Sequence, residues 1–348
     1  MLHSSGAAAI SKVRAMYGKR LSPKDWENLL ACSTIKEAAA YLKNNTAYQD
    51  VLSKVSSETI HRHELERFLQ ERLVQESFKL SHYDVSGSWN ASHFILANLE
   101  IDQILSAVIR VISHEDDHYF HEPNRYLDAM SRLDQRSLDK ADTFAEILEA
   151  IEETPYYEIL NPFSFESEKQ EDYTRMEREL QVYAYRRMYE YIDQNASKNA
   201  QKALRQLFDE MIDLTNYSRI FRMKKYFGTS NVEIRYRLFP FGNINKERMQ
   251  EMIAAESEVQ LTEIMKQTRT GKRVLKIEHQ TIDELAATVR HQLCRRNILY
   301  SEESSVVMLS YIFLLQAELN GLIHVIEGVR YGMPKAEIRR LLQLYDFV

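Results

Sequence analysis

A short pattern occurs three times along this 348-residue chain, at intervals of 108 and 114 residues. Each copy is an acidic and apolar helix that ends in Thr, with Tyr or Thr two residues later and an aliphatic residue six residues later. A unit of this length that recurs three times predicts a pseudo-threefold assembly of like helical modules. Such an assembly suits a ring-shaped or axial partner better than a small substrate. The anchor residues are Thr46, Tyr48 and Leu52; Thr154, Tyr156 and Leu160; and Thr268, Thr270 and Val274.

The composition favours an all-α fold. Only 9 Gly and 6 Pro interrupt a chain that is rich in Glu, Lys, Leu, Ala and Met, which are strong helix formers. Hydrophobic residues make up 44% of the chain and charged residues 28%, as in globular proteins with well-formed cores. The predicted modules are residues 1–112, residues 113–220 and residues 221–348, the last with a C-terminal closing helix.

Charge and cysteine content exclude several classes of protein. The net charge of −6, with both signs mixed along the chain, argues against general binding to DNA or RNA, which needs a basic footprint. Cys32 and Cys294 are too far apart to be read as a disulfide framework, so we expect a reducing compartment. The N-terminus lacks the features of a signal peptide. The longest uncharged stretch, 304–317, is too short to span a membrane and predicts a buried core helix.

The anchors and the segments after them predict local structure. A Thr hydroxyl at the end of a short helix can satisfy a free backbone group and set the following turn, so we assign the anchors no chemistry. Long amphipathic helices are expected at 57–80, 167–191 and 282–298, where apolar residues recur with helical spacing. The 20 Tyr, four of them within 183–191, are expected mainly to fill wide helical cores.

A weaker pattern marks the transitions between modules. Asn216 and Gly228 recur as Asn320 and Gly332, with Asp213 just before the first pair. The two Gly are expected to end helices, and a new helix is expected to begin at Pro334. Residues 232–242 alternate between apolar and polar types, which predicts a short strand or an extended arm.

These segments resemble the C-type subunit of bacterial and archaeal V/A-type rotary ATPases, which corresponds to the d-type subunit of the eukaryotic proton pump. The resemblance is carried by the lead-in "RAMYGKRLSPKDWENLL", the anchor "LKNNTAYQDVL", and the transition "DLTNYSRIFRMKKYFG" followed by "LFPFGNINKERMQEMI". It covers the chain from Ile10 to Leu344. The first transition, "IDQILSAVIRVISHEDDHYFHEPN", departs from the pattern because it lacks the Asn and the Gly.

The resemblance implies a three-domain helical funnel that sits on the rotor ring in the membrane and holds the foot of the central stalk in its cavity. Such a protein is no enzyme and needs no cofactor. It couples the stalk of the ATP-hydrolysing head to the ring, for proton or sodium transport, as a peripheral protein on the cytoplasmic face. The chain itself has no GxxxxGK[ST] loop, so we expect no ATP binding.

One motif supports a different class of function. His114, Glu115 and His118 fall in "HEDDH", which matches the HExxH pattern of zinc peptidases, and His121 lies nearby. On a helix, the two imidazoles would share a face and leave an open zinc position, with Glu115 as the base. A zinc-dependent hydrolase is therefore the alternative function, and incidental metal binding is a further one. We favour a solvated acidic connector, because no sheet is evident and Pro123 follows at once.

Basic and aromatic residues alternate between Arg219 and Arg237. They are open to three interpretations: a nucleic-acid patch, a solvated helix face over a core, or a docking surface for an acidic partner. The acidic total and the absence of a known nucleic-acid motif disfavour the first. In a pseudo-threefold arrangement, lead-in and transition helices could face one cavity. The predicted partner-binding residues are Arg14, Tyr17, Arg222, Lys225, Tyr226 and Tyr331.

Overall fold

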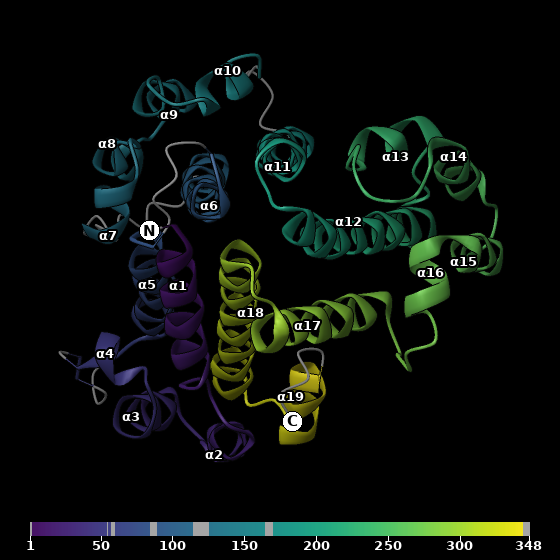
Figure 1. The fold of residues 1–348 in the computed structure, drawn as a ribbon. Coiled ribbons are helices and arrows are strands. Elements are labelled where there is room, and N and C mark those ends of the chain that lie inside the picture. Colours follow the sequence, from purple (N-terminus) through teal and green to yellow (C-terminus); the bar gives the residue numbers. More distant parts are fainter. Residues whose placement is uncertain are drawn as a thin grey trace. The chain divides into compact units, whose positions relative to one another are not determined.

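All regular elements in the described part of the chain are helices, as the composition predicts. A computed structural model describes residues 2–53, 55–56, 60–83, 89–113, 125–163 and 170–343 (Figure 1). By its contacts, the chain divides into unit 1, Met1–Glu76 with Ser197–Val348, and unit 2, Ser77–Ala196. The division into modules 1–112, 113–220 and 221–348 stays a prediction.

Helices of like length follow one another in the same order three times. Each run has two short helices, a very short one and two long ones. The first run is α2 (Pro23–Ala31), α3 (Ile35–Asn45), α4 (Gln49–Leu52), α5 (Arg62–Ser81) and α6 (Ala91–Ser113). The second is α8 (Gln135–Lys140), α9 (Phe144–Ala150), α10 (Tyr156–Leu160), α11 (Gln170–Gln194) and α12 (Lys198–Phe227). The third is α14 (Lys246–Ala254), α15 (Glu258–Gln267), α16 (Arg269–Val274), α17 (Ile282–Tyr300) and α18 (Ser304–Arg330). The other helices are α1 (Leu2–Tyr17), α7 (Arg125–Met130), α13 (Asn231–Arg237) and α19 (Lys335–Gln343).

The second helix of each run begins with the same cap. Thr34, Thr143 and Ser257 accept a hydrogen bond from the backbone N–H three residues later, at the starts of α3, α9 and α15. The side chain at that third position, Glu or Gln, accepts in turn from the N–H just before the cap, at 2.7, 2.8 and 2.9 Å. This reciprocal capping fixes where the chain turns into the helix.

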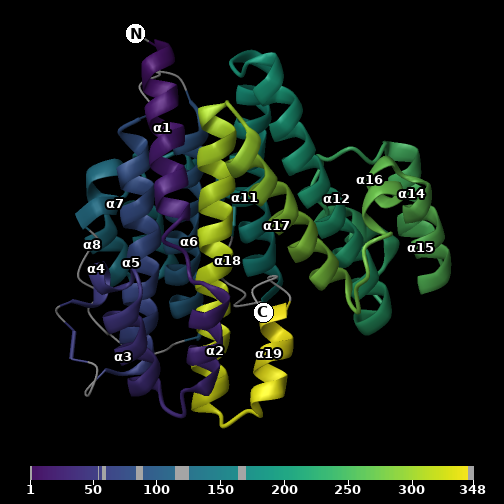
Figure 2. The same ribbon diagram turned by 60° about the horizontal axis from the view of Figure 1, so that its bottom comes forward.

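Helix α18 lies at the centre of unit 1. It contacts α1, α3, α12, α17 and α19, and Figures 1 and 2 show α1 and α17 on either side of it. It is the one described helix that is long and apolar enough to cross a membrane, but 78% of its apolar window is buried within the structure. The expected core helix is therefore confirmed, although it runs well past residue 317. In unit 2, α6 packs against α8, α9 and α11.

Most local expectations are confirmed, and one is wrong. Gly228 ends α12 in the left-handed region, with φ +56°, and Gly332 follows α18 with φ +62°. The segment 232–242 holds neither a strand nor an extended arm at its start, because α13 occupies Asn231–Arg237. Ser230 caps this helix, and Arg237 pairs with Glu233 one turn away at 2.6 Å. The apolar alternation there reflects a helix with few buried residues rather than a pleated strand.

Candidate functional site

Each Thr anchor closes the end of a short helix. Thr46 Oγ1 donates to the carbonyl of Leu42 at 2.6 Å and accepts from Tyr48 N–H at 3.2 Å. Thr154 makes the equivalent pair of bonds, to the carbonyl of Ile151 at 2.7 Å and from Tyr156 N–H at 3.3 Å. The third anchor, Thr268, donates to Met265 O at 2.7 Å and accepts from Gly271 N–H at 2.9 Å. The structural role expected for the three hydroxyls is confirmed.

The hydroxyl two residues after each anchor donates to a buried or partly buried acid on a long helix, a contact that we call an acid clasp. In the first clasp, Tyr48 donates to Glu318 Oε1 on α18 at 2.9 Å. The other carboxylate oxygen, Oε2, accepts from Leu21 N–H at 2.9 Å, just before the Ser22 cap of α2. One carboxylate therefore joins the backbone before α2 to the turn between α3 and α4.

The second clasp lies in unit 2. Tyr156 donates to Glu100 Oε2 on α6 at 2.6 Å. The hydroxyl of Ser131 donates to Glu100 Oε1 and accepts from Leu133 N–H at 2.9 Å. Leu133 precedes the Asp134 cap of α8, as Leu21 precedes the cap of α2. Here the carboxylate reaches the entry backbone through one serine hydroxyl.

The third clasp lies in unit 1. The hydroxyl of Thr270 donates to Asp213 Oδ2 on α12. Oδ1 of Asp213 accepts from Asn243 N–H at 2.9 Å and from Ile244 N–H at 3.2 Å, just before the Asn245 cap of α14. The same three parts thus recur with different residues: an acid, a hydroxyl two residues past a Thr, and the backbone before a helix cap.

Burial dominates the protonation of two of these acids. Desolvation raises the pKa of Asp213 to about 6, against the hydrogen bonds from Thr270 and the backbone, which lower it. Desolvation also raises the pKa of Glu318, with Arg72 and the bonds from Leu21 and Tyr48 acting in the opposite direction. An acid whose pKa is raised by burial can hold helices together through its hydrogen bonds and still respond to a change of pH.

One of these acids can be recognised from the sequence, although the repeat and spacing patterns described above did not identify it. Glu318 is the only Asp, Glu, Lys or Arg between Ser304 and Ile326. A lone charge in so apolar a helix is costly to bury unless it is hydrogen-bonded, so it marks a buried contact. Asp213 lies in a more polar helix, and no comparable pattern distinguishes it.

Of the predicted partner-binding residues, Arg14 and Tyr17 lie together on α1. Arg14 bonds the carbonyls of Ile298, Leu299 and Ser301 at 2.9, 3.2 and 3.1 Å, which caps the C-terminus of α17. Tyr17 is buried. The guanidinium of Arg14 is therefore largely occupied by hydrogen bonds within the chain.

Lys225 and Tyr226 lie together at the end of α12, and Arg222 is exposed one turn before. Lys225 pairs with Glu258 on α15 at 3.1 Å, while Tyr226 and Phe227 are 64% and 73% exposed. We call this surface the α12 tip. Other cations of the same basic run are used internally, since Arg219 donates to the carbonyl of residue 237 at 2.8 Å.

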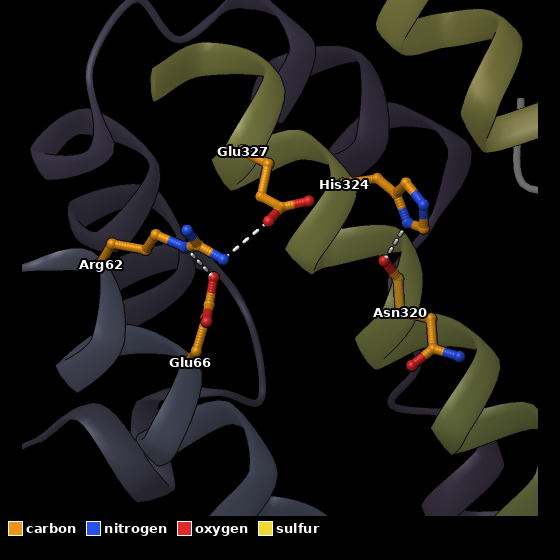
Figure 3. Close-up of polar contacts among 5 residues, drawn as sticks. All are labelled: Arg62, Glu66, Asn320, His324 and Glu327. Carbon is orange, nitrogen blue, oxygen red and sulfur yellow. Dashed lines mark hydrogen bonds and ion pairs between the residues drawn. The ribbon is translucent and has the colours of Figure 1, made fainter. Parts of the chain in front are cut away.

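Tyr331 follows α18 and is 67% exposed. Among the described residues, no hydrogen bond or ion pair joins it to Arg14 or to the α12 tip. Near this end of α18, Arg62 on α5 bonds Glu66 on its own helix and Glu327 on α18, both at 2.6 Å, as Figure 3 shows. On the other side of α18 in this view, His324 Nδ1 lies 2.6 Å from the carbonyl oxygen of Asn320.

The two Asn of the transition pattern have unlike surroundings. Asn216 is buried and exchanges two hydrogen bonds with the backbone of Phe239, at 3.0 and 2.9 Å. Asn320 accepts from Gln316 one turn earlier, at 3.0 Å. The shared 12-residue spacing therefore marks helix length, not a shared contact.

The HEDDH segment, with His114, Glu115 and His118, lies outside the described residues, as does His121. Within the described ranges, no group of three or more His, Cys, Asp or Glu is placed to hold a metal ion.

Two adjoining hollows lie in unit 1. One, of about 220 Å³, is bordered by Arg20, Arg72 and Arg295, and we call it the arginine pocket. The other, of about 310 Å³, shares Tyr17, Arg20 and Arg295 with it. Sequence reasoning missed these residues, because the three arginines come from segments far apart in the chain.

These features define an all-helical protein whose repeated helix runs are held together by buried or partly buried acids. The chain belongs to the ATP synthase (C/AC39) subunit family, whose model matches residues 9–341. It is therefore a V/A-type ATPase subunit of the C/d type. No curated protein matches the chain.

Proposed function

We propose that this protein is the non-catalytic connector between the central stalk and the membrane rotor ring of a V/A-type ATPase. The observation that carries the proposal is the recurrence of the acid clasp in three runs of a chain that belongs to this family. A part that transmits torque must resist bending. Clasps that tie each set of short helices to a long helix at two points restrict such motion, because several hydrogen bonds must break together.

The proposal includes three modules, at 1–112, 113–220 and 221–348, that form a funnel for the stalk foot. The protein would sit peripherally on the cytoplasmic face of the membrane. Exposed residues of the α12 tip and Tyr331 are the best candidates for partner contact, because they combine exposure with aromatic and basic character. Arg14 and Tyr17 fit this surface less well, because Arg14 caps α17 and Tyr17 is buried.

The α12 tip provides the sharper test. Arg222→Glu with Lys225→Glu removes two exposed cations, whereas reversal of Arg14 would also disturb α17. Wild-type and variant complexes are reconstituted in vesicles, and ATP-driven ion uptake is measured beside the rate of ATP hydrolysis. We expect less uptake per ATP hydrolysed, with hydrolysis by the isolated head unchanged. Dispersed charge contacts are worth under about 1 kcal/mol each, so uptake should be reduced rather than abolished.

The matched control is Lys246→Glu with Lys272→Glu, two exposed lysines outside the proposed surface. Equal coupling in the control, the variant and the wild type, with normal assembly, would show that the α12 tip is the wrong surface. A complex that assembles and pumps without this protein would overturn the functional proposal itself.

A further inference from the structure

The arginine pocket has an unusual lining for the interior of a helical unit. Three guanidinium groups border about 220 Å³, from the turn after α1, from α5 and from α17. The only carboxylate in the lining belongs to Glu318. Apolar and aromatic side chains, including Trp26 and Leu314, form most of the remaining lining, together with His291. The lining therefore carries a surplus of positive charge.

Arg72 is the innermost of the three arginines. It is 6% exposed, and its Nε and Nη1 have no hydrogen-bond partner among the described residues. The guanidinium lies 4.1 Å from the centre of the Tyr48 ring, a cation–π contact that supplies no oxygen or nitrogen acceptor to Nε and Nη1. Buried guanidinium donors are rarely left unpaired in proteins, so this group calls for a partner from outside the chain.

The nearby acids do not serve as that partner. Glu318 accepts from Tyr48 and from Leu21 N–H, both at 2.9 Å. Glu76, one turn after Arg72 on α5, accepts from the Tyr311 hydroxyl at 2.9 Å. These acids lie close enough to favour the charged guanidinium electrostatically, but their hydrogen bonds go to other donors.

The other two arginines stand at the exposed side of the pocket. Arg20 lies over the ring of Tyr17 at 4.3 Å and donates to the Tyr17 carbonyl at 3.2 Å. Arg295 on α17 is exposed and forms no ion pair within the described part of the chain. Both can turn their guanidinium groups towards an anion that rests on Arg72.

We propose that the arginine pocket binds a phosphate group, held by Arg72 at its base and by Arg20 and Arg295 at its mouth. A tetrahedral oxyanion offers oxygens to three guanidinium groups at once, whereas a carboxylate offers two oxygens in one plane. The adjoining hollow of about 310 Å³ shares Arg20 and Arg295. It leaves room for the rest of a phosphomonoester, so the group can come from free phosphate or from such a molecule.

Titration calorimetry on the full chain tests the site, with inorganic phosphate and with glycerol 3-phosphate as probes at constant ionic strength. We expect saturable binding of about one ion per chain with a dissociation constant below about 1 mM. Tighter binding of glycerol 3-phosphate would assign the site to a phosphomonoester, and tighter binding of phosphate would assign it to the free ion.

Variants separate the site from surface charge. Arg295→Gln should weaken phosphate binding at least tenfold with an unchanged melting temperature, because the side chain is exposed. The matched control is Arg296→Gln, the neighbouring exposed arginine, which bonds Gln206 at 2.9 Å and does not line the pocket. Arg72→Met should abolish binding, with circular dichroism to confirm that the variant is folded.

Two results would overturn the proposal. The absence of saturable binding of either probe to the wild type would leave a pocket that holds water only. Equal binding by the wild type, Arg295→Gln and Arg296→Gln would place the anion elsewhere on the surface.

Discussion

Tyr48→Phe removes one hydroxyl from the first acid clasp and leaves the rest of the side chain in place. Tyr48 is 1% exposed, and its hydroxyl is the donor to Glu318 Oε1. Phe keeps the ring beneath Arg72 and creates almost no cavity. The loss is therefore one buried hydrogen bond together with an acceptor left without its donor, which costs about 1–3 kcal/mol. In a unit of this size, a loss of about 2 kcal/mol lowers the melting temperature by roughly 4–8 °C.

The chain's two tryptophans allow the measurement to be made on one unit at a time. Trp26 lies in unit 1 and Trp89 in unit 2. In a Trp89→Phe background, tryptophan fluorescence during urea unfolding reports on unit 1, where the first clasp lies. The control is Tyr236→Phe, whose side chain is 74% exposed, and it should change the free energy of unfolding by less than about 0.5 kcal/mol.

The result that refutes the reasoning is specific. The reasoning fails if the free energies of unfolding of Tyr48→Phe and of the Tyr236→Phe control agree within about 0.5 kcal/mol. In that case water or Arg72 replaces whatever the Tyr48 hydroxyl contributes. If the loss is real, Tyr156→Phe should show one of similar size in unit 2, measured by Trp89 in a Trp26→Phe background. Its hydroxyl makes the equivalent bond to Glu100 at 2.6 Å.

Two further predictions concern the third clasp, one for Asp213 and one for Gly271. Burial raises the folded-state pKa of Asp213 from 3.8 to about 6, so its stabilising effect is complete below about pH 4 and is lost as the pH rises through about 6. Relative to Asp213→Asn, the wild type should therefore lose about 2 kcal/mol of unfolding free energy between pH 4 and 7 in urea titrations, and parallel pH profiles would contradict this. Gly271→Ala would place a Cβ 1.9 Å from the Met265 carbonyl oxygen and should cost about 1–3 kcal/mol in thermal unfolding. Gly18→Ala, whose nearest contact is 3.4 Å, should be tolerated, and equal melting temperatures would refute the clash.

Sequence reasoning succeeded where the chemistry is local. The role of Thr46 depends on backbone groups within four residues, and a Gly with positive φ at 228 depends on the end of one helix. It failed at 232–242, where a capped helix of seven residues has too few buried positions to show a helical period. The sequence could not show that Arg72 and Glu318 line the same pocket, because 246 residues separate them and no local pattern records which helices meet.

The helix that supplies the acid of each clasp is informative about the proposed threefold arrangement. In the second and third runs, the acid comes from the last long helix of the run before, α6 for α8–α10 and α12 for α14–α16. In the first run, α2–α4, the acid comes from α18, the last long helix of the third run. An open row of the three runs would leave Tyr48 without an acid and Glu318 without a hydroxyl. A cyclic order gives every run one acid and one hydroxyl, so the first clasp is the contact that the proposed closure requires.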